Sequence, residues 1–97
     1  MAELRLSAAA DADLAAILDF SIAQFGRETA EAYLRGIDKA LDLLRRHPGV
    51  GALRAEITPP VRCLPHRSHR IFYDIEGDTV WIVRVIHASM DVEGRLG

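Results

Sequence analysis

The hydrophobic pattern is clearest near the carboxyl end, where two apolar runs flank a short turn. Residues 69–76 and 79–87 are rich in Ile, Val, Phe, Tyr and Trp, as β-strands are. Gly77-Asp78 separates the runs, and glycine in the first turn position is typical of a type II′ hairpin. A two-residue turn places Ile71 opposite Arg84. Neither face of this hairpin is cleanly polar, so we expect both faces to be at least partly covered.

Two helical stripes precede the hairpin. Across Ala8–Phe25, apolar residues recur at spacings of three and four, and Ser7 is placed to act as the N-cap. A second stripe begins near Arg27 and is ended by Pro48-Gly49. The junction between the stripes is too short for anything but an antiparallel pair of helices. Gly36 lies inside the second helix, where it either marks a close approach to a neighbour or is simply tolerated.

Shorter segments complete the pattern. Residues 3–7 alternate polar and apolar, and residues 52–58 and 61–64 form possible further strands. The order is β-α-α-β-β-β, which predicts one α+β domain over residues 1–97, with an antiparallel helical hairpin packed on one face of a mainly antiparallel sheet. No remaining element covers the second sheet face, which includes Phe72. Either a partner buries that face, or sheet curvature and the C-terminal tail hide it.

Composition narrows the classes of protein. The net charge of −2 gives the whole chain no electrostatic preference for nucleic acid or for membranes. The single cysteine, Cys63, permits no internal disulfide and fits a reducing compartment. Aspartates interrupt the one Ala/Leu-rich segment, so we expect neither a signal peptide nor a membrane span. These features predict a cytoplasmic protein without membrane contact.

Positive charge is nevertheless concentrated locally. Residues 57–73 contain three arginines and two histidines but no acid. Arg84 adds a charge inside an otherwise apolar run, where it needs a partner or an exit to solvent. It either pairs with an acid, from a helix or from Asp91, or contacts an anion such as nucleic acid. The full set of basic candidates is Arg62, His66, Arg67, His69, Arg70, Arg84 and His87.

Two groups of residues have spacings found in metal sites or catalytic triads, but each lacks a feature that such a site needs. Cys63-x-x-His66-x-x-His69 has no second ligand pair for structural zinc, and residues three apart on a strand point to opposite faces. His87, Ser89 and Asp91 are residue types found in catalytic triads, yet nothing marks the serine as a nucleophile. We therefore expect no metal, no cofactor and no triad, and we expect the cysteine to be a small buried residue.

Together, the motifs resemble those of the ParE branch of the ParE/RelE superfamily, toxins from bacterial type II toxin–antitoxin modules. The family's fold has the element order inferred from the pattern. The matching features span nearly the whole chain and are Asp13-Leu14-x-x-Ile17, Phe25-Gly26, Ala32-Tyr33, Pro48-x-x-Gly51-x-x-Arg54, Arg62, His69-x-Ile71-Phe72-Tyr73 and Arg84-Val-Ile-His87-x-x-Met90-Asp91, with Leu96.

The resemblance implies a toxin that blocks DNA gyrase and inhibits bacterial growth, and that is not an enzyme. It also implies a ParD-like antitoxin whose C-terminal segment folds along the toxin. The N-terminal part of that antitoxin would carry the hetero-oligomeric complex to operator DNA. The target-binding candidates are Arg62, Arg67, His69, Arg70, Arg84, His87, Met90 and Asp91.

Two alternatives stay open. RelE-like relatives cleave mRNA on the ribosome, with a histidine available here for acid–base chemistry. Such a nuclease would use Arg62, Arg84 and His87. RelE-like proteins typically carry a C-terminal tyrosine, whereas residues 88–97 contain neither tyrosine nor lysine, and Tyr33 and Tyr73 are assigned to packed elements. The second alternative is a degenerate toxin that serves only as antitoxin ligand and co-repressor.

Overall fold

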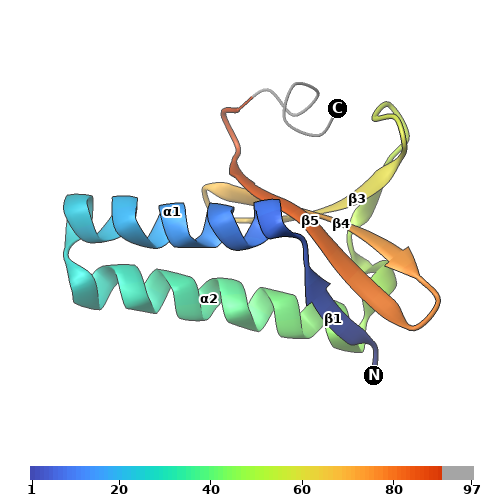
Figure 1. Cartoon of the computed structure of the whole chain (residues 1–97), viewed down its shortest axis with the longest axis horizontal. Coiled ribbons are helices and arrows are strands. Elements are labelled where there is room, and N and C mark those ends of the chain that lie inside the picture. Colours follow the sequence, from blue (N-terminus) through green and yellow to red (C-terminus); the bar gives the residue numbers. More distant parts are fainter. Residues whose placement is uncertain (91–97) are drawn as a thin grey trace.

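A helical hairpin packs against one face of a five-stranded sheet in the computed structural model, which describes residues 1–90 (Figure 1). Neighbouring strands follow the order β1-β5-β4-β3-β2; β1 is parallel to β5 and the other pairs are antiparallel. The predicted α+β class, element order and mainly antiparallel sheet are confirmed. The elements are β1 (Glu3–Leu6), α1 (Ala8–Phe25), α2 (Arg27–Arg46), the 3-10 turn η1 (Pro48–Val50), β2 (Ala52–Arg54), β3 (Val61–His66), β4 (His69–Glu76) and β5 (Thr79–His87).

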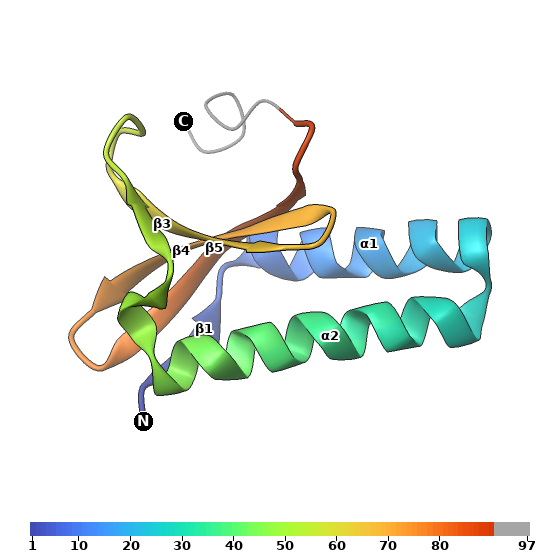
Figure 2. The ribbon, with the colours of Figure 1, turned by 180° about the vertical axis from the view of Figure 1, so that it is seen from behind.

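The helical hairpin begins and turns where its capping residues predict. The Ser7 hydroxyl accepts the Ala10 N–H at 3.0 Å and donates to the Val83 carbonyl at 2.7 Å, so the cap of α1 is also tied to β5. Gly26 joins the helices with φ +88°, a conformation that side chains disfavour. The helical hairpin extends beyond the edge of the sheet, as Figures 1 and 2 show from opposite sides.

The main core lies between the helices and the sheet. Its side chains come from one stripe of each helix and from the inward positions of β4 and β5, as the two hydrophobic periods predict. The fully buried members include Tyr73. The buried cluster is Ala10, Ile17, Ile37, Leu41, Leu44, Ile71, Tyr73, Val80, Ile82 and Val85.

The second sheet face is not left bare, although no helix or strand among residues 1–90 covers it. Phe72 and Ile86 are buried there, in a cluster with Val61 and Cys63. Ile57, from the segment after β2, folds over this cluster and is itself only 5% exposed. Of the alternatives left open by the sequence, neither a partner nor the C-terminal tail is needed to bury this cluster, because the irregular segment that carries Ile57 covers it.

The predicted hairpin register holds from the turn as far as Tyr73 and is wrong beyond it. Tyr73 pairs with Ile82, but a bulge then pairs Phe72 with Arg84 instead of Val83. Every pair farther from the Gly77-Asp78 turn is shifted by one residue, so Ile71 lies opposite Val85 and not opposite Arg84. A bulge of this kind redirects the side chains that follow it.

The two short strands also differ from the expected bounds. β2 is three residues long because the chain leaves the sheet after Arg54. β3 continues through Pro65 to His66. Proline is tolerated at this point because β2 pairs only as far as Cys63, so no strand on that side needs an N–H from residue 65. Within residues 1–90, neither helix combines the length and the apolarity needed to cross a bilayer.

Candidate functional site

Three histidines lie side by side across three strands, and we call them the histidine row: His66, His69 and His87. His66 pairs with His69 across the β3–β4 turn, and His69 pairs with His87 across β4 and β5. Tyr33, from α2, places its hydroxyl 2.7 Å from His69 Nδ1. Its ring also meets the rings of His66 and His69 edge-on, at centroid distances of 5.8 and 5.5 Å. The sequence brought the histidines to attention but left Tyr33 among ordinary packed residues.

The surroundings of His66 and His69 favour neutral imidazoles. Burial lowers the pKa of His69, and the neighbouring His87 and His66 lower that pKa further. Burial also lowers the pKa of His66, with a contribution from the charge of Arg67. A neutral His69 can accept the Tyr33 hydroxyl hydrogen at Nδ1, which fixes its tautomer. Tyr33 of α2 therefore contacts two rings of the row whose environment favours the uncharged form.

An apolar groove of about 560 Å³ adjoins the row between α1 and the end of β5. Phe20 on α1 is 64% exposed and Met90 is 43% exposed, so large apolar side chains line it while facing solvent. His69 and His87 lie at its polar end. The groove is lined by Asp13, Ala16, Ile17, Phe20, Ser21, His69, Arg84, Val85, Ile86, His87, Ser89 and Met90.

His87 contacts a serine within this groove. Its Nδ1 lies 2.7 Å from Ser89 Oγ and also accepts the Ser89 backbone N–H at 3.1 Å. Both contacts span two residues, so they describe a local turn after β5. Asp91, the third residue of the triad pattern and a target-binding candidate, lies outside the described residues.

Arg84 binds an acid of the first helix. Its Nε and Nη2 each lie 2.7 Å from a different Asp13 oxygen, a bidentate pair that raises the pKa of Arg84. Asp13 Oδ2 also accepts the Val85 N–H at 2.9 Å. Because β1 pairs with β5 only as far as Ile82, this stretch of β5 has a free edge for α1 to occupy. Of the readings of Arg84 weighed from the sequence, the ion pair with a helix acid is confirmed.

Arg62 holds a loop in place. Its Nη1 donates to the carbonyl oxygens of Gly51 at 2.8 Å and Gly49 at 3.3 Å. In the same loop, the buried Tyr73 hydroxyl donates to the Pro48 carbonyl at 2.6 Å and accepts the Gly51 N–H at 2.8 Å. A Cβ on residue 51 would lie 2.6 Å from that hydroxyl, which explains the glycine. Tyr73 and Gly51 therefore have structural roles that their motifs did not reveal.

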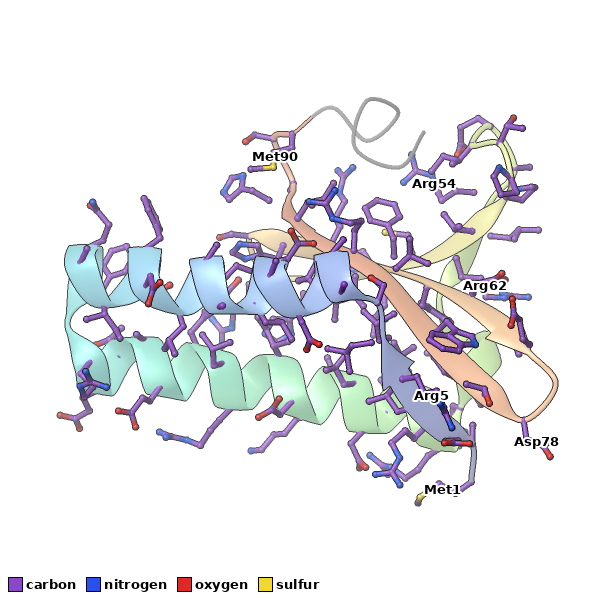
Figure 3. The ribbon with its side chains drawn as sticks, viewed as in Figure 1. Met1, Arg5, Arg54, Arg62, Asp78 and Met90 are labelled. Carbon is purple, nitrogen blue, oxygen red and sulfur yellow. The ribbon has the colours of Figure 1, made fainter. Side chains whose placement is uncertain are left out.

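Of the three residues of the nuclease alternative, Arg84 and His87 line the same groove, whereas Arg62 lies elsewhere. Arg62 is bound to the loop before β2, Arg84 is bound to α1, and His87 is exposed at the end of β5. Figure 3 shows Arg62 well away from Met90, which marks the end of the strand that carries His87.

The remaining candidates lie on different surfaces. Arg67 is exposed in the β3–β4 turn, whereas Arg70 pairs with Ile86 on the second sheet face. Cys63 is buried on that second face, opposite to His66, as their spacing predicts, and burial raises the pKa of its thiol. Within residues 1–90, no group of three or more His, Cys, Asp or Glu side chains could hold a metal ion.

Comparison with known proteins decides the family. Residues 4–92 match the family described as ParE toxin of type II toxin-antitoxin system, parDE. The chain belongs to this ParE toxin family. Toxin ParE1 of Mycobacterium tuberculosis (strain CDC 1551 / Oshkosh) is 40% identical over 92 residues, which cover 94% of each chain. Toxin ParE1 of Caulobacter vibrioides is 35% identical over the full length of both chains.

A solved structure of the same family has the same fold. The structure titled "Chromosomal ParDE TA system from P. aeruginosa" superposes with a TM-score of 0.78 at 27% identity. The alignment covers 90% of this chain and 96% of that one. The resemblance drawn from the motifs is confirmed, and this toxin is a ParE-type member of a type II toxin–antitoxin system.

Proposed function

We propose that this toxin acts in the cytoplasm by binding DNA gyrase and is not an enzyme. The observation that carries the proposal is the match of residues 4–92 to the ParE family. Arg62 donates to a loop carbonyl and Arg84 is paired with Asp13, and these contacts argue against a nuclease role for either arginine. The nuclease reading thus loses two of its three residues to structural contacts.

The target-facing surface in this proposal is the end of the sheet beyond the histidine row. His69 and His87 lie there beside the exposed Met90, and Asp91 follows directly in the chain. Arg70 and Arg67 flank this end on the other face and in the β3–β4 turn. Arg62 and Arg84 take part by holding the scaffold, not by contacting the target.

The antitoxin partner is proposed to be ParD-like, with a C-terminal segment that folds onto the toxin. The apolar groove supports this, because Phe20 and Met90 offer exposed apolar surface next to polar anchor points. A segment lying in the groove would also cover His87, so neutralisation follows from steric blocking. The resulting hetero-oligomer would reach operator DNA through the antitoxin.

The proposal is tested with full-length toxin freed from its antitoxin. We expect loss of DNA supercoiling by purified gyrase and intact mRNA on translating ribosomes. The double variant His87→Asp with Arg70→Glu should inhibit gyrase less, whereas Arg35→Gln, a charge change on the exposed outer surface of α2, should inhibit like the parent. Cleaved mRNA with normal supercoiling would establish the RelE-type alternative. Normal growth on strong expression without antitoxin would favour the degenerate toxin.

A further inference from the structure

A second groove lies on the other side of the histidine row from the proposed antitoxin groove, and it shares Arg67 with the surface proposed for gyrase. It runs between α2 and the end of β3, with a volume of about 640 Å³, a size typical of small-molecule sites. The β3–β4 turn projects from the sheet towards the helical hairpin (Figure 2), and Arg67 of this turn lines the groove. The groove is lined by Thr29, Ala32, Tyr33, Gly36, Lys39, Ala40, Leu43, Leu64, Pro65, His66 and Arg67.

The charged side chains that line this groove are both cations. Lys39 is the chain's single lysine and Arg67 belongs to the acid-free stretch of the sequence. Within residues 1–90, neither forms an ion pair, whereas the nearby acids Glu31 and Asp42 are paired with arginines of their own helix. The groove therefore has two cations that form no salt bridge within residues 1–90, and an anionic ligand would pair with them.

A buried imidazole nitrogen adds a third polar group. His66 Nε2 is buried and has no hydrogen-bond partner within the described residues. A Cβ on residue 36 would lie 3.2 Å from this atom, so the glycine in α2 lets the imidazole ring approach the helix closely. An unsatisfied buried polar atom has a free-energy cost, and a rotation of the His66 ring that brings this nitrogen to a ligand oxygen in the groove would remove it. Of the two explanations of Gly36 left open by the sequence, close approach is the one observed.

The β3–β4 turn fixes the position of Arg67 beside the groove. Arg67 is the first of the two turn residues between His66 and His69, and its φ of +51° is the positive value that such tight hairpin turns require. Glycine and asparagine adopt this conformation most easily, so an arginine there costs on the order of 1 kcal/mol. The residue that the turn holds in this conformation is one of the two cations of the groove.

We propose that this groove binds a small phosphate monoester, with Lys39, Arg67 and His66 as its ligands. Arginine and an imidazole N–H can each donate to phosphate oxygens, and lysine adds a point charge. A nucleic-acid backbone fits less well, because Glu28, Glu31 and Asp38 are exposed on the same helix and the net charge is −2. Those acids would repel a long polyanion that extends past the groove.

The test uses the full-length toxin and follows the His66 ring signals by NMR, assigned with His66→Gln. The groups near this imidazole are Tyr33, Lys39, Arg67 and His69. Inorganic phosphate and a nucleoside monophosphate should each give a saturable shift, and either should raise the pKa of His66. Chloride at equal ionic strength should do neither.

Matched variants assign the binding to the groove. Lys39→Gln and Arg67→Gly should each weaken phosphate binding about tenfold, the loss expected for one charge-assisted contact. Arg67→Gly also removes the backbone strain, so it should melt no earlier than the parent, which separates lost binding from lost folding. Arg35→Gln should bind like the parent.

Three outcomes would overturn the proposal. They are no saturable response to either phosphate, equal weakening in Arg35→Gln, and parental binding in both Lys39→Gln and Arg67→Gly. A DNA duplex that binds more tightly than the monophosphate, and loses this in the same variants, would overturn the choice of a small ester. The proposal does not depend on gyrase binding, since phosphate binding is measured on the isolated toxin.

Discussion

Among single residues, the pair of Asp13 and Arg84 has the most evident structural role. It joins the start of α1 to the free edge of β5, and both side chains are largely shielded, with 13% and 24% exposed. Asp13 also holds the Val85 N–H, so one carboxylate satisfies three donors. Removing Arg84 would leave the shielded Asp13 carboxylate without its guanidinium donors, and removing Asp13 would leave the Val85 N–H without its acceptor, so the pair is costly to break.

We expect Asp13→Asn and Arg84→Met each to lower the free energy of unfolding by about 2–3 kcal/mol. The double variant should lose less than the sum of the two single losses, since both single variants remove the same contact between the two side chains. Urea unfolding of the four proteins measures this. Removal of the exposed pair Arg27–Glu31, 3.8 Å apart, is the control and should cost less than about 0.5 kcal/mol. Additive losses would show that the two side chains act independently.

The Tyr73 hydroxyl gives a second prediction at this scale. Tyr73→Phe keeps the buried ring but leaves the Gly51 N–H and the Pro48 carbonyl without their partner. We expect a loss of about 1–3 kcal/mol in unfolding free energy, measured by urea or heat. The loop from Pro48 to Gly51 should also exchange its amide hydrogens faster. A variant as stable as the parent would mean that water replaces the hydroxyl.

At the scale of elements, the ends of β3, β4 and β5 assemble the histidine row, and α2 adds Tyr33. Burial lowers the pKa of His66 and of His69 below the ordinary value of 6.5. Below pH 6.5 the unfolded chain therefore takes up protons that the folded chain does not. The contribution of these histidines to stability is present above pH 6.5 and is lost as pH falls through their lower folded pKa values.

We expect the urea midpoint of the toxin to fall between about pH 7 and about pH 5. His69→Gln with His66→Gln should remove much of that fall, because the two titrating groups are gone. The exposed His47, at the end of α2, provides the matched variant His47→Gln. If the double variant keeps the full pH dependence, the acid sensitivity arises from other groups.

At the scale of the whole molecule, α1 presents apolar side chains on both of its faces. Ile17 is buried against the sheet, while Phe20 and Phe25 are 64% and 66% exposed on the outside. A helix that is apolar all round is normally buried, so the outer face is suited to a partner. The groove continues from this face to His87, which places the proposed antitoxin and target surfaces next to each other.

We expect Phe20→Ser with Phe25→Ser to weaken the antitoxin complex at least about tenfold, the usual size of a lost apolar anchor. Gyrase inhibition should persist, so the variant should remain toxic in cells that carry the antitoxin. Binding is measured with purified proteins, and Ala23→Ser on the same helix is the control. Unchanged affinity would move the antitoxin to another surface.

The fold was largely predictable, because its signals are local. Periods of 3.6 and 2 residues, the Ser7 cap and the Gly77-Asp78 turn depend on neighbours within a few positions, and all are observed. The family resemblance was predictable from spaced motifs for the same reason. The site was predictable only in part: the histidines were named, but the target-binding roles stay predictions.

The tertiary structure decided what depends on residues far apart in the chain. The bulge between Phe72 and Tyr73 shifts the pairing with β5 by one position. At the edge of β5, α1 contacts Arg84 through Asp13, which is 71 residues away in the sequence. Tyr33 reaches His69 across 36 residues. No local sequence pattern predicts such contacts. Many different pairings of residues are compatible with the same helix and strand periodicity, and the packing of the helices on the sheet determines which of them form. The sequence thus determined the elements, the fold class and the family, and only their packing decided which charges are bound and which are free for a partner.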